Sequence, residues 1–381
     1  MQALAALLDD FLAAGSGTAA AVSARGLRGE QLDVCRGTAA PGGAKIDART
    51  RFDVASLTKV VATTSVAAAL VARGELDLDA LEDDEDGALP VRALLGHRSG
   101  LVAWRPWFEV ARALPACSGL WPGGGGGTDR RAAALAVRAA VRALAPEESG
   151  RVYSDAGFLR LGWALERAGC APLDALARRL VWDPLGLDGL GFRPLGELTP
   201  DPGVPVTGVW RPREPAPGQE GSYAVRAQLP ELRPSEVDDD NAWALGGVAG
   251  HAGVFATAEA VAALGLAWLR AREGEGWLPA EVARSFIAPD APHFAPVRSL
   301  GWDRARRTGS TAGDLIAGGD AGAVGHLGFT GCSLWLDLDR GLSVALLTNR
   351  VYPSRTGVAS LRALRPRVGD AVVRALSAGR G

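Results

Sequence analysis

Short apolar runs and helical spacings divide the chain into strand-like ends and a helix-rich middle. The first fifteen residues place apolar side chains on one side of a predicted amphipathic helix: Leu4, Leu7, Leu8, Phe11 and Leu12. Residues 18–40 contain two apolar runs around a glycine-containing turn, which is typical of a β-hairpin. The chain is therefore expected to begin with a surface helix followed by paired strands.

The C-terminal part repeats this pattern in reverse. Residues 332–350, CSLWLDLDRGLSVALLTNR, hold two β-rich runs around Asp339-Arg340-Gly341, which predicts a second hairpin, and residues 357–379 return to a helical pattern. Helical patterns also cover residues 132–145 and 156–180. A sheet assembled from both ends of the chain, with a helical part inserted between them, fits this order.

Three segments of the middle have the composition of loops. Residues 76–90 are acidic but lack the spacing of a calcium loop, which favours a solvated loop over a metal site. Residues 123–127 are five glycines without the Lys-Ser/Thr of a phosphate loop, so we expect a mobile insertion, with a lid beside the active site as the alternative. Residues 194–236 are rich in proline and predict an irregular excursion within the domain.

Composition then excludes several classes of protein. The chain has 381 residues, 48% of them hydrophobic and 22% charged, with a net charge of −2, so neither nucleic acid nor an acidic membrane is expected as a partner. The N-terminus has no basic segment before its apolar residues, and no run is expected to span a bilayer, which favours the cytoplasm. The cysteines are widely spaced, so we expect reduced thiols, no metal and no cofactor: Cys35, Cys117, Cys170 and Cys332.

The scarcity of lysine draws attention to residues 52–64, FDVASLTKVVATT. The chain has 41 Lys plus Arg, but only Lys45 and Lys59 are lysines. Arginine does not release its proton, whereas the pKa of a lysine can be moved toward neutrality. A buried helix is predicted to begin near Ser56 and end at Gly74, which puts Ser56 and Lys59 on one face. Burial and the helix N-terminus would favour a neutral Lys59 able to take the serine proton.

Two further segments carry candidate chemistry. Tyr153, in RVYSDAGF, is one of three tyrosines, and a phenol beside a lysine can act as a general acid or base. His326, in GHLGFTG, precedes a predicted strand, and Gly328 allows a close backbone approach to a ligand. The alternatives are a tyrosine hydrogen-bonded in the core and a structural histidine.

The motifs ASLTK, YSD and HLG, in this order, resemble those of the serine β-lactamase and penicillin-binding-protein superfamily, and most closely its class C β-lactamase-like hydrolases. The resemblance runs from about residue 45 to 360 and includes LLGHRSGL, LGGVAGHAGVFATA and LLTNRVYPSR. It implies one α+β domain, an antiparallel sheet flanked by helices. An α/β subdomain would comprise about residues 1–70 and 290–381, and a helical subdomain about residues 71–289.

Carried onto this sequence, the resemblance implies that Ser56 is the acylated nucleophile, with Lys59 and Tyr153 as its acid/base partners. The backbone N–H groups of Ser56 and Phe329, the latter after Gly328, would form the oxyanion hole. His326 would face the substrate beside Tyr153.

Three positions depart from the β-lactamase pattern. Asp155 stands where an asparagine amide would donate a hydrogen bond, and an ionised carboxylate can only accept one. His326 replaces a lysine, and Leu327 replaces a threonine or serine. These changes remove the fixed cation and a hydroxyl from the expected carboxylate-binding position.

The sequence therefore predicts a monomeric serine hydrolase of small ester or amide substrates. The alternatives are a β-lactamase, a D,D-carboxypeptidase or D-aminopeptidase, and a ligand-binding member of the fold without catalysis. The remaining histidines, His97, His251 and His293, are interpreted as structural, and residues 238–241 as a solvated loop at the edge of the cleft.

Overall fold

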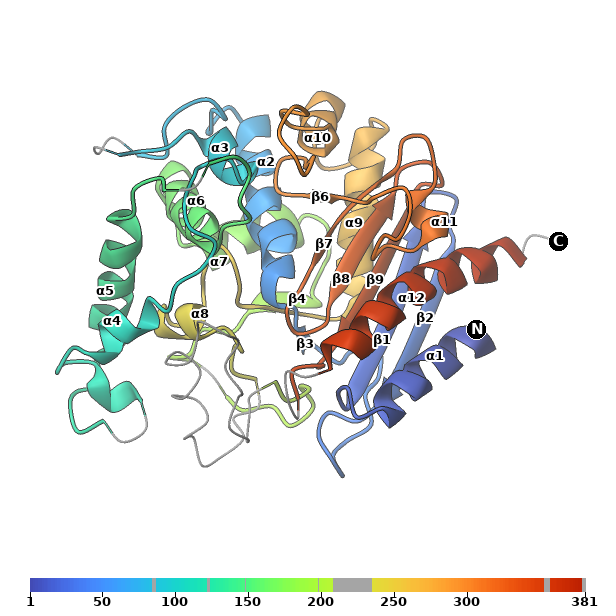
Figure 1. The fold of residues 1–381 in the computed structure, drawn as a ribbon, viewed down its shortest axis with the longest axis horizontal. Coiled ribbons are helices and arrows are strands. Elements are labelled where there is room, and N and C mark those ends of the chain that lie inside the picture. The colour runs from blue at the N-terminus through green and yellow to red at the C-terminus, as the bar shows by residue number, and fades with distance from the viewer. Residues whose placement is uncertain are drawn as a thin grey trace.

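A six-stranded antiparallel sheet is the frame of the molecule (Figure 1). The computed structural model describes residues 1–83, 87–121, 124–147, 149–197, 199–207, 235–352 and 357–378. The strand order is β2-β1-β9-β8-β7-β6, so the N-terminal and C-terminal hairpins meet at the β1–β9 pair. The strands are β1 Ala19–Gly26, β2 Gln31–Gly37, β6 Asp303–Arg304, β7 Ala323–Leu327, β8 Ser333–Asp337 and β9 Leu342–Thr348. Both predicted hairpins and the sheet built from the two chain ends are confirmed.

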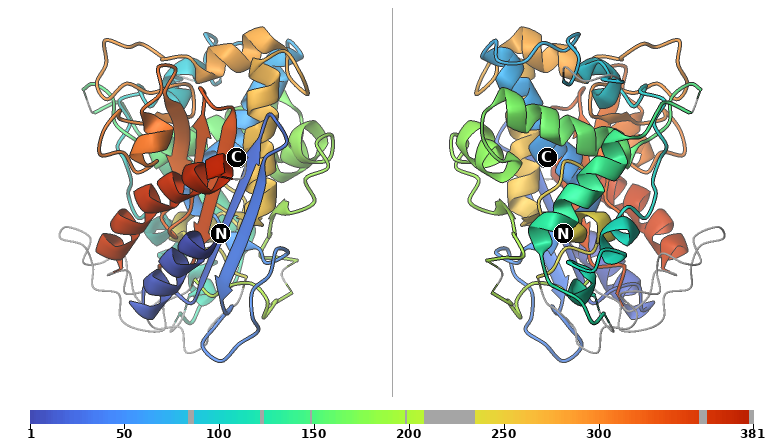
Figure 2. Two further views of the ribbon diagram at one scale, coloured as in Figure 1. Left: turned by 90° about the vertical axis from the view of Figure 1, so that its right-hand side faces the viewer. Right: turned by 90° about the vertical axis from the view of Figure 1, so that its left-hand side faces the viewer.

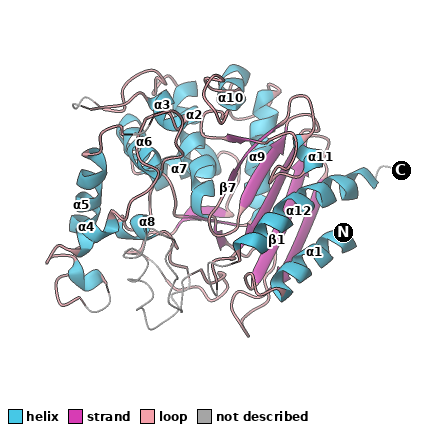
Figure 3. Ribbon diagram, viewed as in Figure 1, coloured by secondary structure: helices cyan, strands magenta, loops and turns pink. Residues whose placement is uncertain are grey.

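Helices cover both faces of this sheet. Helices α1 (Gln2–Ala13) and α12 (Val358–Ala378) lie side by side on the outer face, while α9 (Ala258–Arg272) covers the inner face (Figures 1 and 2). Leu4, Leu8 and Phe11 of α1 are buried against the sheet, which confirms the predicted amphipathic helix. The predicted fold class is thereby confirmed: an antiparallel sheet with flanking helices and a helix-rich remainder (Figure 3).

Most of the other helices lie on the far side of α9 from the outer pair, around a small sheet ordered β3-β5-β4. They are α3 Val91–Leu95, α4 Phe108–Arg112, α5 Arg130–Arg142, α6 Asp155–Ala168, α7 Leu173–Ala177, α8 Asp240–Ala244 and α10 Ala280–Ile287, and the strands are β3 Phe52–Asp53, β4 Leu190–Phe192 and β5 Val254–Ala256. Helix α11, Asp314–Ala317, lies instead against α12 on the outer side of the large sheet. The helical pattern over 156–180 is interrupted between α6 and α7, where Cys170 adopts φ 50, and α7 continues as a π-helix, Arg178–Trp182. The division into two subdomains stays a prediction.

The predicted buried helix after Ser56 changes type twice. It starts as a 3-10 turn, Ala55–Leu57, continues as a π-helix, Lys59–Thr64, and becomes α2 at Ser65–Ala72. The hydroxyl of Ser65 donates to Val60 O (2.7 Å) and the indole of Trp182 donates to Val61 O (2.9 Å). These donors occupy carbonyls that an α-helical ladder would use, which accounts for the widened turn.

One window of this helix contradicts the expectation that no run of the chain is long and apolar enough to span a bilayer. Within the described residues, the window 55–72 is long and apolar enough to cross a membrane by length and composition alone. However, 83% of that window is buried inside the protein, between the sheet and the helical part (Figure 1). Its apolar character is that of a core helix.

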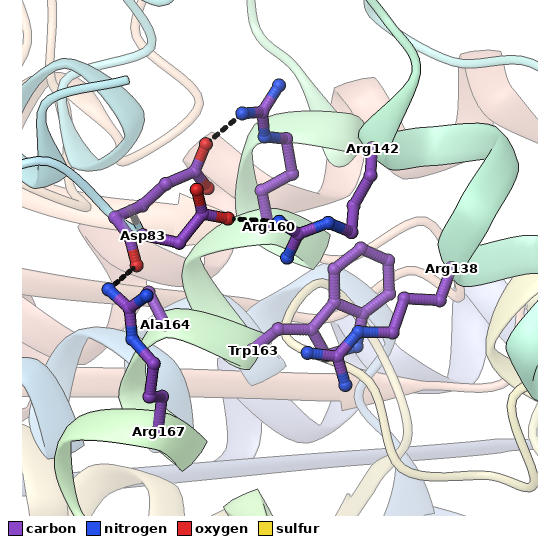
Figure 4. Close-up of a pocket in the computed structure, with 8 residues that line it drawn as sticks. Asp83, Arg138, Arg142, Arg160, Trp163, Ala164 and Arg167 are labelled. Atoms are coloured by element: carbon purple, nitrogen blue, oxygen red, sulfur yellow. Dashed lines mark hydrogen bonds and ion pairs between the residues drawn. The ribbon is translucent and has the colours of Figure 1, made fainter. Parts of the chain in front are cut away.

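The acidic segment 76–90 is wrongly predicted as a wholly solvated loop. The side chain of Glu82 is buried and pairs with Arg160, and Asp83 pairs with Arg142 (Figure 4). Arg167 donates to the carbonyl of Glu82. Burial of a carboxylate requires such partners, so this part of the segment is fastened to α5 and α6. Residues 84–86 lie outside the described residues.

The glycine run lies against the preceding loop in its described part, residues 124–127. Gly127 N donates to Pro115 O (2.8 Å), and Gly119 N donates to Gly127 O (2.9 Å). A Cβ on Gly124 would lie 1.9 Å from Ser118 O, so side chains are excluded by this close backbone approach. Mobility of the loop and a lid role both stay predictions. Of the predicted excursion 194–236, residues 198 and 208–234 lie outside the described residues.

Close packing of α9 on the sheet gives a stability prediction. A Cβ at Gly265 would lie 2.2 Å from Ser343 Oγ and 2.6 Å from Leu336 Cδ2. We expect Gly265→Val to lower the free energy of unfolding by about 1–3 kcal/mol through overpacking, as measured by urea denaturation. Ala263→Val, at a half-buried position of the same helix, is the control. Equal stability of the two variants would contradict the packing described.

Candidate active site

Ser56 follows a backbone turn that a buried carboxylate holds in place. Ala55, the residue before it, adopts φ 47, which is strained for a residue with a Cβ. Asp53 Oδ1 accepts a hydrogen bond from Ala55 N (2.8 Å), and Asp53 Oδ2 accepts one from Asp238 N (2.7 Å). Burial raises the pKa of Asp53 to about 7. Asp53 therefore ties the serine turn to the segment that precedes α8.

Lys59 lies beneath Ser56 with its side chain fully buried. Its ammonium donates to Ser56 Oγ (3.1 Å), to Asp155 Oδ1 (2.7 Å) and to the carbonyl of His251 (3.2 Å). An ammonium has three donors, and all three find an acceptor here. The structure thus brings the predicted serine and lysine together and adds a carboxylate to the pair.

The prediction that Lys59 is neutral is wrong. Burial lowers its pKa, but the charge of Asp155, the hydrogen bond to Asp155 and the neighbouring Tyr153 together outweigh burial, so the pKa of Lys59 is raised above its ordinary value. Asp155 lies 96 positions from Lys59, so the sequence around Lys59 gives no sign of this ion pair. Lys59 rests as an ammonium.

Tyr153 completes the group around the serine. Lys59 Nζ lies 4.9 Å from the centre of its ring, and Lys59 and Ser56 both act to lower the pKa of its hydroxyl. Burial raises the pKa of this phenol. The start of α6 fixes the position of Tyr153, because Ser154 caps the helix by accepting a hydrogen bond from Gly157 N (3.0 Å).

His326 lies at the end of β7, and its ring centre is 5.8 Å from that of Tyr153. Burial lowers the pKa of His326 to about 4, so the imidazole is neutral at physiological pH. Its Nδ1 lies 2.9 Å from Leu327 O, an arrangement in which Nδ1 carries the hydrogen. This geometry agrees with the expected lack of a fixed cation at the third motif.

The turn after β7 packs directly on the serine segment. A Cβ at Gly328 would lie 2.4 Å from Val54 O, so only glycine permits this approach. Thr330 Oγ1 donates to Asp53 O (2.7 Å) from the same turn. Phe329, at the tip, is 47% exposed. The turn is therefore beside Ser56, while the oxyanion role of the Phe329 N–H stays a prediction.

The prediction of a solvated loop at residues 238–241 is wrong. Asp239 Oδ1 lies 2.9 Å from His251 Nε2 and also caps α8 through Ala242 N, and Asn241 is fully buried. The backbone carbonyl of His251 accepts from Lys59. This segment therefore supports the floor of the site.

Sequence reasoning missed several neighbours of the site. His97 packs its ring 4.7 Å from that of Tyr153, and its Nδ1 accepts from Ser154 N (3.0 Å). The guanidinium of Arg298 lies 5.4 Å from the Tyr153 ring. His97 was visible in LLGHRSGL and interpreted as structural, whereas nothing local in the sequence distinguishes Arg298 from the many other arginines.

No candidate metal centre accompanies these residues. In the part of the chain that the structure describes, no group of three or more His, Cys, Asp or Glu side chains is arranged to hold a metal ion. The four cysteines form no disulfide.

Comparison with known proteins identifies the family of the chain. The sequence profile of the family described as Beta-lactamase matches residues 4–366. The chain belongs to this family. The resemblance seen in the sequence motifs is thereby confirmed, and the class of enzyme that the family and its members support is a hydrolase of the serine β-lactamase fold.

Proteins similar to this β-lactamase-family chain are named as esterases and amidases. Esterase EstB of Burkholderia gladioli is 32% identical over 81% of this chain and 79% of its own length. N-acetylmuramyl-L-alanine amidase of Bacillus subtilis is 28% identical over 81% of this chain and 70% of its own. The D-amino acid amidase from Ochrobactrum anthropi SV3, solved with D-phenylalanine, shares the fold with a TM-score of 0.68 at 19% identity, over 98% of this chain and 99% of that one.

The ion pair of Lys59 predicts a pH effect. The Asp155 carboxylate favours the protonated ammonium, so its removal leaves burial to lower the pKa of Lys59. We expect the acid limb of the kcat/KM profile for an activated ester to move to lower pH in Asp155→Asn. Glu281→Gln, which removes an exposed carboxylate on α10, is the control. A limb that stays at the wild-type pH, or moves upward, would contradict this account of the pair.

Proposed function

We propose that the protein is a serine hydrolase that forms an acyl-enzyme on Ser56 from small ester or amide substrates. The single observation that carries the proposal is the contact of the Ser56 hydroxyl with Lys59, whose ammonium also lies beside Tyr153. Ser56 Oγ lies 3.1 Å from Lys59 Nζ, and the centre of the Tyr153 ring lies 4.9 Å from the same Nζ. A serine hydroxyl becomes nucleophilic when an adjacent base takes its proton, and this arrangement supplies the base.

The proton balance follows from the resting charges. Lys59 as ammonium and Tyr153 as phenol together hold one proton too many to act as a base. Loss of one proton leaves a reactive pair, in which ammonium–phenolate and amine–phenol are two tautomers of one state. That pair takes the Ser56 proton as Oγ attacks the acyl carbon, then gives it to the leaving alcohol or amine. A water molecule later gives one proton to the same pair as its oxygen attacks the acyl carbon, and the pair returns that proton to Ser56 Oγ as the C–Oγ bond breaks and the acid leaves.

The oxyanion of the tetrahedral intermediate needs donors on the opposite side from the base. We assign this role to the N–H groups of Ser56 and Phe329. The contact between Gly328 and Val54 supports the assignment, since it places the turn against the serine segment. Such preorganised donors stabilise negative charge that develops in the transition state.

The substrate class is inferred from the second and third motifs, since the Arg298 guanidinium beside the Tyr153 ring is already paired with Asp303. His326 is neutral and Asp155 accepts rather than donates, so the third and second motifs offer no fixed cation and no amide for a substrate carboxylate. Neutral acyl donors, such as simple esters and amides, suit this environment. The names of the esterase and amidase relatives support the same class.

A panel of p-nitrophenyl esters, D-amino acid amides and a chromogenic cephalosporin separates the proposal from its alternatives. Ester or amide turnover well above cephalosporin turnover is expected. Cephalosporin hydrolysis at a rival rate would favour a β-lactamase instead. Tight binding of ligands without turnover of any substrate would favour a non-catalytic member of the fold.

The nucleophile is tested by covalent labelling. A fluorophosphonate probe should label the wild-type enzyme at Ser56, as located by mass spectrometry of peptides, and Ser56→Ala should lose the label. Ser285→Ala removes an exposed serine on α10 and should label normally. Undiminished labelling of Ser56→Ala would refute the assignment.

A further inference from the structure

The C-terminal helix places a buried cation behind the turn that carries Phe329. Arg365, in the first half of α12, is only 9% exposed. Within the described residues it forms no ion pair with a carboxylate. The nearby Cys332 cannot supply the counter-charge, because burial raises the pKa of its thiol to about 11. Burial lowers the pKa of Arg365 to about 10, which still leaves the guanidinium charged at neutral pH.

A buried charge without a counter-ion is costly unless its hydrogen bonds compensate for the lost water. Among the described residues, the hydrogen bonds of Arg365 both go to the turn after β7. Its Nη2 donates to Gly328 O (3.0 Å) and to Cys332 O (2.8 Å). The two carbonyls flank the turn, whose ends are also joined by Gly328 N donating to Cys332 O (2.8 Å). Arg365 therefore braces the turn from the side of α12.

The carbonyl of Gly328 belongs to the same peptide group as the N–H of Phe329. A peptide unit is planar and trans, so its C=O and N–H point in opposite directions. Gly328 O accepts from Gly331 N (3.1 Å) as well as from Arg365. Two donors on this oxygen fix the direction of the Phe329 N–H, which must point away from Arg365.

The contact also changes the strength of that donor. A cationic donor on a carbonyl polarises the peptide group, and hydrogen bonds in such a chain strengthen one another. The N–H of Phe329 becomes a better donor to an anion. The charge of Arg365 itself, held in a medium of low dielectric constant, adds attraction for negative charge that develops beyond the peptide.

We propose that Arg365 is a positioning residue of the hydrolase: through the Gly328–Phe329 peptide it orients and polarises an oxyanion-hole donor while touching no substrate atom. The inference rests on the proposed function, in which the Phe329 N–H binds the oxyanion. It assigns a role in catalysis to a helix that the three motifs do not include.

Kinetics of Arg365→Met test the inference. We expect kcat for an activated ester to fall about 10–100-fold while KM stays nearly constant. This fall is smaller than, or similar to, the fall in kcat that removal of one oxyanion-hole donor causes. The affinity for a boronic acid transition-state analogue should fall by the same factor. Arg365→Lys, which keeps the charge but not the planar fork, should lie between Met and wild type. It also serves as the test variant if Arg365→Met does not fold.

Arg25→Met is the matched control for losing a buried arginine. Arg25 donates to Ala24 O (2.9 Å) and pairs with Asp33 and Glu259. Thr348, at the end of β9, contacts the turn through Thr330 O and pairs with Ala20 of β1. Arg25 lies five residues further along β1 than Ala20, and hence about 16 Å from this contact. We expect this variant to lose stability in urea and to keep the wild-type kcat and the wild-type affinity for the boronic acid.

Failure of the inference differs from failure of the proposed function. Wild-type enzyme without a label on Ser56 would overturn both. Wild-type labelling together with an unchanged kcat in Arg365→Met would overturn the role of Arg365 alone. A proportional loss of kcat and of inhibitor affinity in Arg25→Met would also overturn it, because the effect would then reflect a general loss of structure.

Discussion

The buried ammonium of Lys59 is the interaction on which the rest of the site depends. Removing a charge from water costs several kcal/mol, and only close acceptors compensate for that cost. Lys59 therefore requires a carboxylate from α6, a hydroxyl from the 3-10 turn and a carbonyl from the loop before β5. Three segments remote in sequence converge because each supplies one acceptor. The same convergence brings the Ser56 hydroxyl and the Tyr153 ring next to the Lys59 ammonium.

The two halves of the site are held by different kinds of contact. On the helical side, the cap of α6 fixes Tyr153 and Asp155 relative to Lys59. On the sheet side, the turn after β7 packs its glycine backbone on the serine segment, with Arg365 behind it. Asp53 joins the two by accepting from Ala55 and from Asp238. Ser56 lies where these contacts meet, so the proposed chemistry and the stability of the fold share the same hydrogen bonds.

The sequence predicted the sheet, its two hairpins and the terminal helices, because short-range apolar patterns determine them. It also named Ser56, Lys59 and Tyr153 as a group, which the structure brings together. It failed on Lys59 protonation and on the environment of Glu82, since both depend on partners from distant segments. The contacts of Arg365 with the turn could not be predicted for the same reason, because they join residues more than thirty positions apart in the sequence. In addition, arginine is too abundant in this chain for one arginine to stand out.

The central claim is that Lys59 must lose and regain a proton beside Ser56. An arginine in its place would keep the charge and the pairing with Asp155 but could not release a proton. The most direct measurement is the rate of acyl-enzyme formation from an activated ester in Lys59→Arg, followed by mass spectrometry of the intact protein after rapid mixing. The account predicts acylation at least about 1,000-fold slower than wild type, in a protein that still folds. Acylation within a few-fold of wild type would contradict it.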